Sequence, residues 1–157
     1  MKKSSALAYV GHNERGDREK DDFYPTPESA TQALLDRQKF KGNVWECACG
    51  NGAMSKLMIK NGYDVYSSDL IDRGYGDVKD FLKTNEKHDN IITNPPFNIA
   101  TEFALHGLNS INNKMALLLK LSFLEDKINS PFFTDHESPT APPLYSCQPF
   151  NVSPSKR

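Results

Sequence analysis

The residues best suited to chemistry are four in a row: Asn94, Pro95, Pro96 and Phe97. They follow directly after residues 89–93, which have the pattern of a β-strand. Two consecutive prolines fix the backbone and lack N–H donors, so the loop is predicted to be rigid and extended. The Asn94 side-chain oxygen and the Pro95 carbonyl could then face one planar amino group, and the Phe97 ring could stack on a planar base. The loop therefore predicts a site for a flat group that carries an –NH2.

A second candidate site is the segment 46–52, which joins a predicted strand to a predicted helix through a glycine turn. Gly50 and Gly52 would let the backbone approach a ligand closely. The pattern is not the full dinucleotide-binding fingerprint, because Ala48 stands where its first glycine would be. By itself the turn leaves two interpretations open, a ligand cradle or an ordinary tight turn.

Two carboxylates follow further along the chain. Asp69 ends the next predicted strand, where a carboxylate could bind the two hydroxyls of a ribose. Asp80 is followed by Phe81, and this pair could contact an adenine through a hydrogen bond and ring packing. Each of these residues could equally be an ordinary structural or solvated residue when it is considered alone.

Alternating strand and helix signals must position these residues. Helices are predicted from Pro27, with Thr26 as the N-cap, to about Phe40, and then over 53–61 and 100–111. Strands are predicted over 44–48, 63–68, 89–93 and 115–119, with a short element at 78–82. This alternation predicts an α/β fold with a Rossmann-like, doubly wound, mostly parallel sheet. Such sheets bind ligands beyond the carboxyl ends of their strands, so the candidate segments should converge.

Composition divides the 157-residue chain into three parts. Residues 1–22 are polar and predict a flexible N-terminal arm, 23–125 carry the predicted core, and 126–157 predict an irregular, proline-rich tail. The length suits one domain and leaves no room for a separate recognition domain. A net charge of −1 counts modestly against tight, unaided binding to duplex DNA.

Cysteine and histidine positions give no metal-binding pattern, so no metal site is expected. Cys47 and Cys49 lack a second pair, and are predicted to be small buried side chains in a reducing compartment. We expect a soluble protein in the cytoplasm of a bacterial or phage-infected cell.

Taken together, these motifs resemble those of the amino-group DNA methyltransferases, in particular the small phage- and prophage-type adenine-N6 methyltransferases. The resemblance covers about residues 21–125 and rests on four motifs in the right order. It implies a class I methyltransferase core with S-adenosyl-L-methionine as its cofactor. The cofactor-binding residues that it implies are Tyr24, Pro25, Thr26, Glu46, Ala48, Gly50, Gly52, Asp69, Asp80 and Phe81. Those that it implies for catalysis and for gripping the target amino group are Asn94, Pro95, Pro96 and Phe97.

The implied activity is methyl transfer from S-adenosyl-L-methionine to the exocyclic N6 amino group of adenine in DNA, with the target base flipped out of the duplex. Two alternatives stay open. One is methylation of another planar amino group, in an RNA base or a protein glutamine. The other is an inactive cofactor-binding domain that acts through protein contacts.

The chain departs from this family after the strand at 115–121. The family's complete fold has further strands there, including a final antiparallel pair, and the proline-rich tail does not resemble them. The sheet is therefore expected to be incomplete at its C-terminal end, and a second copy or a protein partner could cover the exposed edge.

Overall fold

The structure is a computed structural model that describes residues 24–119, 123 and 145–146. The predicted N-terminal arm, 1–22, lies outside the described residues, as does most of the predicted tail. The division of the chain into three parts stays a prediction. Within the described residues, no helix is long and apolar enough to cross a membrane.

Six strands of the described chain form one sheet in the order β3-β2-β1-β4-β5-β6, and every pairing is parallel. The order reverses between β1 and β4, which is the topological switch point of a doubly wound sheet. The strands are β1 (Val44–Glu46), β2 (Val65–Asp69), β3 (Asp77–Val78), β4 (His88–Thr93), β5 (Ile111–Leu117) and β6 (Tyr145–Ser146). The predicted fold class, a Rossmann-like and mostly parallel α/β sheet, is confirmed.

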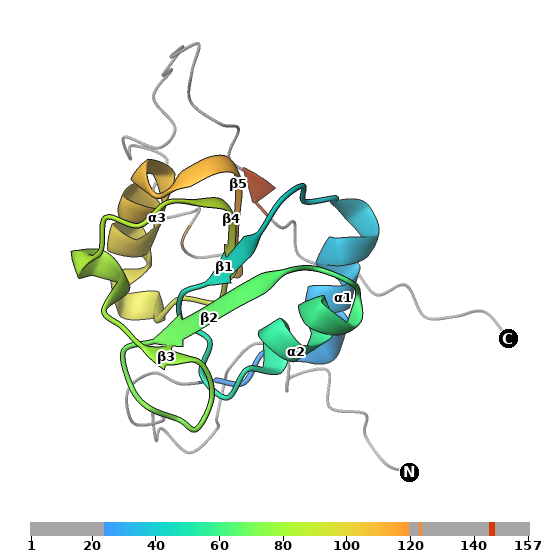
Figure 1. Ribbon diagram of the computed structural model, residues 1–157, viewed down its shortest axis with the longest axis horizontal. Coiled ribbons are helices and arrows are strands. Elements are labelled where there is room, and N and C mark those ends of the chain that lie inside the picture. The colour runs from blue at the N-terminus through green and yellow to red at the C-terminus, as the bar shows by residue number, and fades with distance from the viewer. Residues whose placement is uncertain (1–23, 120–122, 124–144, 147–157) are drawn as a thin grey trace, which may run out of the picture.

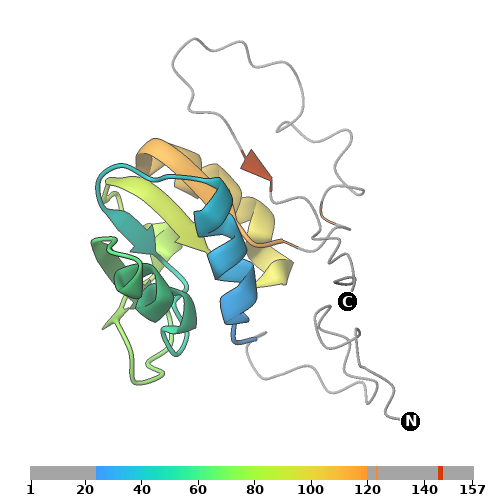
Figure 2. The same ribbon diagram turned by 90° about the vertical axis from the view of Figure 1, so that its right-hand side faces the viewer.

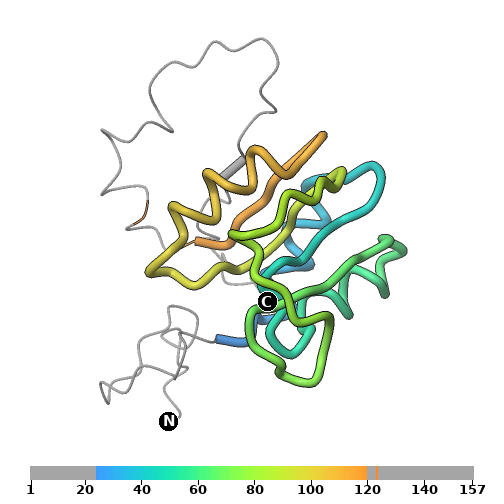
Figure 3. Tube along the Cα trace, turned by 60° about the vertical axis from the view of Figure 1, so that its left-hand side comes forward, coloured from blue at the N-terminus to red at the C-terminus, as the bar shows by residue number. Residues whose placement is uncertain are grey.

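Helices cover both faces of this sheet. The α-helices are α1 (Glu28–Arg37), α2 (Ala53–Lys60) and α3 (Ala100–Asn109), and the short 3-10 turns are η3 (Phe81–Lys83) and η4 (Phe97–Ile99). Helices α1 and α2 lie on one face and α3 lies on the other (Figures 1 and 2). Figure 3 shows the α3 side, where this helix runs beside β4 and β5.

The pleat of the central strands divides the core into two layers. Successive strand residues point to opposite faces of a sheet. Val44 and Ile92 therefore join the apolar cluster under α1 and α2, while Trp45 and Ile91 join the cluster under α3. All four side chains are fully buried. The central strands are apolar on both faces for this reason, as expected for a parallel sheet between two helical layers.

Two of the predicted boundaries at α1 are wrong. The helix ends at Arg37, because Gln38 is extended, and Phe40 then turns into the core beneath the helix. Its N-cap is Pro27, and no side chain caps its first turn. Thr26, which was predicted as the cap, instead accepts a hydrogen bond from the side chain of Asn94.

The boundary between α3 and β5 also differs from the prediction. Ile111 has the apolar spacing of the preceding helix, yet it is the first residue of β5, where it pairs with His88. The Ser110 hydroxyl donates to the His106 carbonyl at 3.0 Å, which satisfies one helix-end acceptor where the chain leaves the helix. Residues 112–114 are polar, so the sequence pattern conceals the first half of the strand.

Two residues of the predicted irregular tail form a strand. Tyr145 and Ser146 of β6 pair in parallel with Ala116 and Leu117 of β5. This pairing covers a short stretch of the sheet edge that was expected to be open. A second copy or another protein covering the rest of that edge stays a prediction.

We expect Ile92→Ala to lower the free energy of unfolding by roughly 2–5 kcal/mol, because it leaves a cavity in the apolar cluster between the sheet and helices α1 and α2. Urea denaturation followed by circular dichroism would measure the change. Ile59→Ala, at a half-exposed position of α2, is the matched control and should cost less than about 1 kcal/mol. Equal costs at the two positions would contradict the assignment of Ile92 to the core.

Candidate active site

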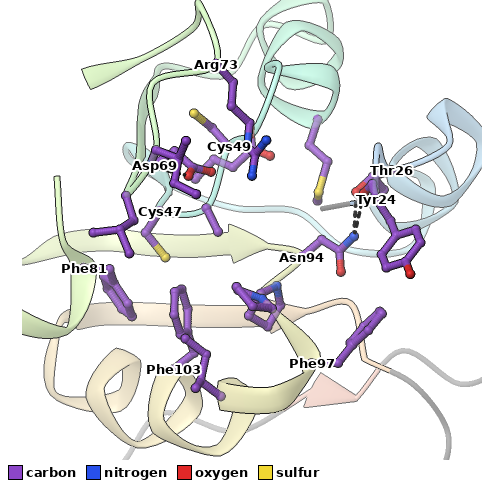
Figure 4. A pocket seen from close by; sticks show the side chains of 18 of the residues that line it. Tyr24, Thr26, Cys47, Cys49, Asp69, Arg73, Phe81, Asn94, Phe97 and Phe103 are labelled. Atoms are coloured by element: carbon purple, nitrogen blue, oxygen red, sulfur yellow. Dashed lines mark hydrogen bonds between the residues drawn. The ribbon is translucent and has the colours of Figure 1, made fainter. Parts of the chain in front are cut away.

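A cleft of about 610 Å³ lies beyond the carboxyl ends of β1, β2 and β4. Its volume is in the range of sites that bind small molecules and cofactors. The segments that the sequence predicted to converge do meet here. The predicted site residues that line it are Tyr24, Pro25, Thr26, Glu46, Ala48, Asp69, Asp80, Phe81, Asn94, Pro95, Pro96 and Phe97. Asp69 and Phe81 lie toward one end of the cleft, and Tyr24 and Phe97 lie toward the other (Figure 4).

Gly50 and Gly52, which were predicted to bind the cofactor, lie behind the cleft wall and are not among its lining residues. Gly50 has a φ of 55°, and its N–H donates to Asp69 Oδ2 at 2.8 Å. Gly52 has a φ of 78° and precedes α2. A side chain at Gly52 would overlap the ring of Tyr75. Both glycines shape the turn, and Gly50 also holds the Asp69 carboxylate. Direct contact between either glycine and a cofactor stays a prediction.

Asp69 is held in place by backbone donors at the end of β2. Its Oδ2 accepts from the Gly50 N–H at 2.8 Å, and its Oδ1 accepts from the Ile71 N–H at 3.0 Å. Each carboxylate oxygen can accept more than one hydrogen bond. The side chain is therefore oriented in the cleft wall while it keeps acceptor capacity for hydroxyl groups of a ligand.

Asp80 and Phe81 form a second part of the wall. Asp80 Oδ1 accepts from the Leu82 N–H at 3.1 Å, which caps the turn η3. The ammonium of Lys83, 2.9 Å from Asp80 Oδ2, holds the pKa of this carboxyl below its usual value. Phe81 is buried against Trp45, with ring centroids 5.1 Å apart. The pair thus presents a fixed carboxylate beside a fixed aromatic ring.

Glu46 is a buried acid at the end of β1. Ser55 Oγ donates to Glu46 Oε2, and Ser55 Oγ lies 2.6 Å from Ser67 Oγ. Burial raises the pKa of Glu46 to about 8, and the nearby charge of Asp69 adds to the rise. At neutral pH this carboxyl is therefore mostly protonated, so the negative charge in this part of the cleft comes from Asp69.

The Asn94 amide has its two ends in different environments. Its Nδ2 donates to Thr26 Oγ1 at 3.1 Å and to the Tyr24 carbonyl at 3.5 Å. Its Oδ1 is shielded from solvent and has no hydrogen-bond partner among the described residues. In Figure 4 this oxygen points away from Thr26, on the side where Phe97 lies. The Tyr24 and Phe97 rings lie close by, with centroids 6.5 Å apart and planes 26° from parallel.

Sequence reasoning missed several residues that line the cleft. Arg73 extends into it from the loop after β2, near Asp69 and Cys49 (Figure 4). The sequence offered one signal for Arg73: it lies in the loop directly after Asp69, the candidate ribose-binding carboxylate. Phe103 was recognised only as part of the apolar face of α3, but it also reaches the cleft and packs on Phe81.

The two cysteines of this region are buried thiols, as predicted, and both are free. Burial raises the pKa of Cys47 well above its usual value and the pKa of Cys49 to about 12. Neither is a thiolate at neutral pH, so neither is suited to act as a nucleophile. Cys147 lies outside the described residues. In the described part of the chain, no group of three or more His, Cys, Asp or Glu could hold a metal ion.

Similarity to known proteins is found among solved structures. No protein-family model matches the sequence, and no curated protein matches it. Among solved structures, the chain is similar to magnesium protoporphyrin IX methyltransferase from Synechocystis PCC 6803, crystallised with bound S-adenosylmethionine. The TM-score is 0.43 and the sequence identity is 20%, over 54% of this chain and 52% of that one. The match therefore spans about half the length of that enzyme.

We expect the stability of the protein to fall between about pH 5 and pH 8 because of Glu46. Its pKa of about 8 in the folded state exceeds the ordinary value of 4.5, so the unfolded chain loses this proton first as the pH rises. Urea denaturation at pH 5, 6.5 and 8 would show the decline. Glu46→Gln, which stays neutral, should show a shallower decline over this window. Parallel curves for the two proteins would contradict a protonated Glu46.

Proposed function

We propose that this chain transfers a methyl group from S-adenosyl-L-methionine to the exocyclic N6 amino group of adenine in DNA. The observation that carries the proposal is the unpartnered side-chain oxygen of Asn94 at the head of the double-proline loop. A buried acceptor without a partner costs roughly 1–3 kcal/mol. A ligand –NH2 would remove this cost, whereas a ligand carbonyl would not.

The cleft suits the proposed cofactor in the groups that it offers. Asp69, fixed by two backbone N–H groups, can accept hydrogen bonds from ribose hydroxyls. Phe81 and the carboxylate of Asp80 can pack against an adenine and accept from its amino group. When bound, the cofactor supplies an already activated methyl group on a sulfonium ion. No residue of the chain then has to form a covalent intermediate.

The chain's own contribution to the reaction would be made at the target nitrogen. The lone pair of an exocyclic amino group is delocalised into the ring, so the nitrogen is a poor nucleophile. Acceptors at Asn94 Oδ1 and the Pro95 carbonyl would favour a pyramidal nitrogen and stabilise its developing positive charge. In that transfer the nitrogen would form its bond to the methyl carbon as the carbon–sulfur bond breaks, and the surplus N–H proton would be released to water.

Access to this acceptor requires movement. Asn94 Oδ1 is shielded from solvent, so an amino group reaches it only after the surrounding side chains shift. The Tyr24 and Phe97 rings lie beside it and could stack on an entering base. An adenine must leave the duplex to enter such a cleft, which is the usual behaviour of enzymes that modify a base.

Other acceptors with a planar amino group would meet the same loop. An RNA base or a protein glutamine offers a similar –NH2, and analysis of the methylated product distinguishes them from DNA adenine. An inactive domain that binds the cofactor and acts through protein contacts would show cofactor binding without transfer to any acceptor. DNA and a second copy of the chain are the proposed partners.

We expect Asn94→Ala to reduce methyl transfer to unmethylated DNA by roughly a hundredfold or more, because it removes an acceptor at the developing charge. The assay uses labelled cofactor and digests the product to nucleosides, with N6-methyladenine expected from the wild type. Asn109→Ala is the matched control, since Asn109 is an exposed residue at the end of α3.

The outcomes of this assay distinguish the proposed function from its two alternatives. Full transfer by Asn94→Ala would remove this residue from the reaction. A methylated RNA base or glutamine in place of N6-methyladenine would reassign the acceptor. Cofactor binding by the wild type without any transfer would favour the inactive domain.

We expect Asp69→Ala to weaken cofactor binding by roughly tenfold or more, as a charged acceptor of hydroxyl groups is lost. Isothermal titration calorimetry measures the dissociation constant, and thermal unfolding checks that the glycine turn survives. Asp72→Ala is the control, because Asp72 is an exposed aspartate of the adjoining loop that accepts a local bond from the Gly74 N–H. An unchanged dissociation constant for Asp69→Ala would place the ribose elsewhere.

A further inference from the structure

The hydroxyl of Thr26 contacts the target-binding loop, although its segment was assigned to the cofactor by resemblance. Thr26 lies just before α1, and Asn94 lies just after β4, 68 positions later in the chain. The Thr26 side chain is nearly buried, with 9% of the residue exposed, and it caps no N–H of α1. Its Oγ1 instead accepts from Asn94 Nδ2 at 3.1 Å.

A second group determines which end of the amide faces this segment. The carbonyl oxygen of Tyr24 lies 3.5 Å from Asn94 Nδ2. A backbone carbonyl can only accept a hydrogen bond, so it requires the –NH2 end of the amide on its side. The Thr26 hydroxyl can bond either end of the amide, so it adds a second hydrogen bond to the orientation that the Tyr24 carbonyl sets. Oδ1 is left pointing away from both groups.

The orientation has a chemical consequence at the cleft. With the –NH2 end held by Thr26 and Tyr24, Asn94 offers an acceptor to an incoming group. A rotation of the amide by about 180° would offer a donor instead, and two –NH2 groups cannot bond to each other through their hydrogens. A weakly held amide would therefore spend part of its time in the wrong orientation for an amino substrate.

We propose that Thr26 is a positioning residue that holds the Asn94 amide in the orientation set by the Tyr24 carbonyl, with its oxygen toward the substrate, and so favours a planar –NH2 over a carbonyl group. This inference rests on the proposed function, because it assigns the acceptor at which the target nitrogen is held. Thr26 acts through Asn94 and is not itself required to touch the substrate.

Three variants test the proposal. Thr26→Val keeps the shape and removes the acceptor, Thr26→Ser keeps the hydroxyl, and Thr31→Val is the matched control. Thr31 is a buried threonine of α1 whose Oγ1 has no hydrogen-bond partner among the described residues. We expect Thr26→Val to lower kcat about tenfold, the usual scale for a lost orienting hydrogen bond. Thr26→Ser and Thr31→Val should stay within about twofold of wild type, and cofactor affinity should be unchanged in all three.

A spectroscopic measurement tests the same contact without relying on turnover. The side-chain amide of Asn94 gives a pair of signals in a nitrogen–proton correlation spectrum, and their loss in Asn94→Ala identifies them. In Thr26→Val the hydrogen-bonded Nδ2 proton should move upfield and exchange faster with water. In Thr26→Ser and Thr31→Val it should stay close to its wild-type position.

These results separate the inference from the proposed function. Wild-type kcat in Thr26→Val would overturn the inference and leave the proposed function standing. A loss of cofactor affinity in Thr26→Val that accounts for its loss of turnover would also overturn it, and would return Thr26 to the cofactor. No transfer by the wild type to any amino acceptor, with the Asn94 signals still dependent on Thr26, would refute the proposed function while leaving the contact itself confirmed.

Discussion

The parallel pairing of β1 with β2 on one side and with β4 on the other is the constraint on which the cleft depends. Parallel strands end at the same edge of a sheet, so the turn after β1, Asp69 after β2 and Asn94 after β4 meet there. The pairing is buried between two helical layers, and Val44, Trp45 and Ile91 have no exposed surface. Loss of packing at these strands would therefore disturb every part of the cleft together.

Within this frame, hydrogen bonds between distant segments fix the functional side chains. The Gly50 N–H holds Asp69 across 19 positions of sequence, and Thr26 holds the Asn94 amide across 68. In both contacts a group from one strand end is oriented by a neighbouring segment. Each side chain also keeps an acceptor for a ligand, either a further lone pair of the Asp69 carboxylate or the unpartnered oxygen of Asn94. In the proposed transfer, the Asn94 acceptor would meet the developing charge on the target amino group.

Burial also determines which side chains of the cleft carry a charge. Glu46 and Asp69 end neighbouring strands, and two carboxylates so close would repel each other if both were ionised. Burial and this repulsion keep Glu46 mostly protonated at neutral pH, while Ser55 and Ser67 supply its polar surroundings. The thiols of Cys47 and Cys49 are neutral for the same reason. The chain thus keeps a charged acceptor at Asp69, where hydroxyl groups of a ligand would bind, without a second charge beside it.

The sequence by itself determined the fold class, most of the strands and helices, and the convergence of the candidate residues, because these follow from hydrophobic period and from the geometry of parallel sheets. It also singled out the loop 94–97, since two prolines restrict the backbone locally. Tertiary structure alone decided that Thr26 binds Asn94 and caps no helix, that Gly50 and Gly52 stand behind the cleft wall, and that Arg73 reaches into it. It also placed Ile111 in a strand although its spacing is helical. These features depend on contacts between segments far apart in the chain, and local propensity carries no information about such contacts.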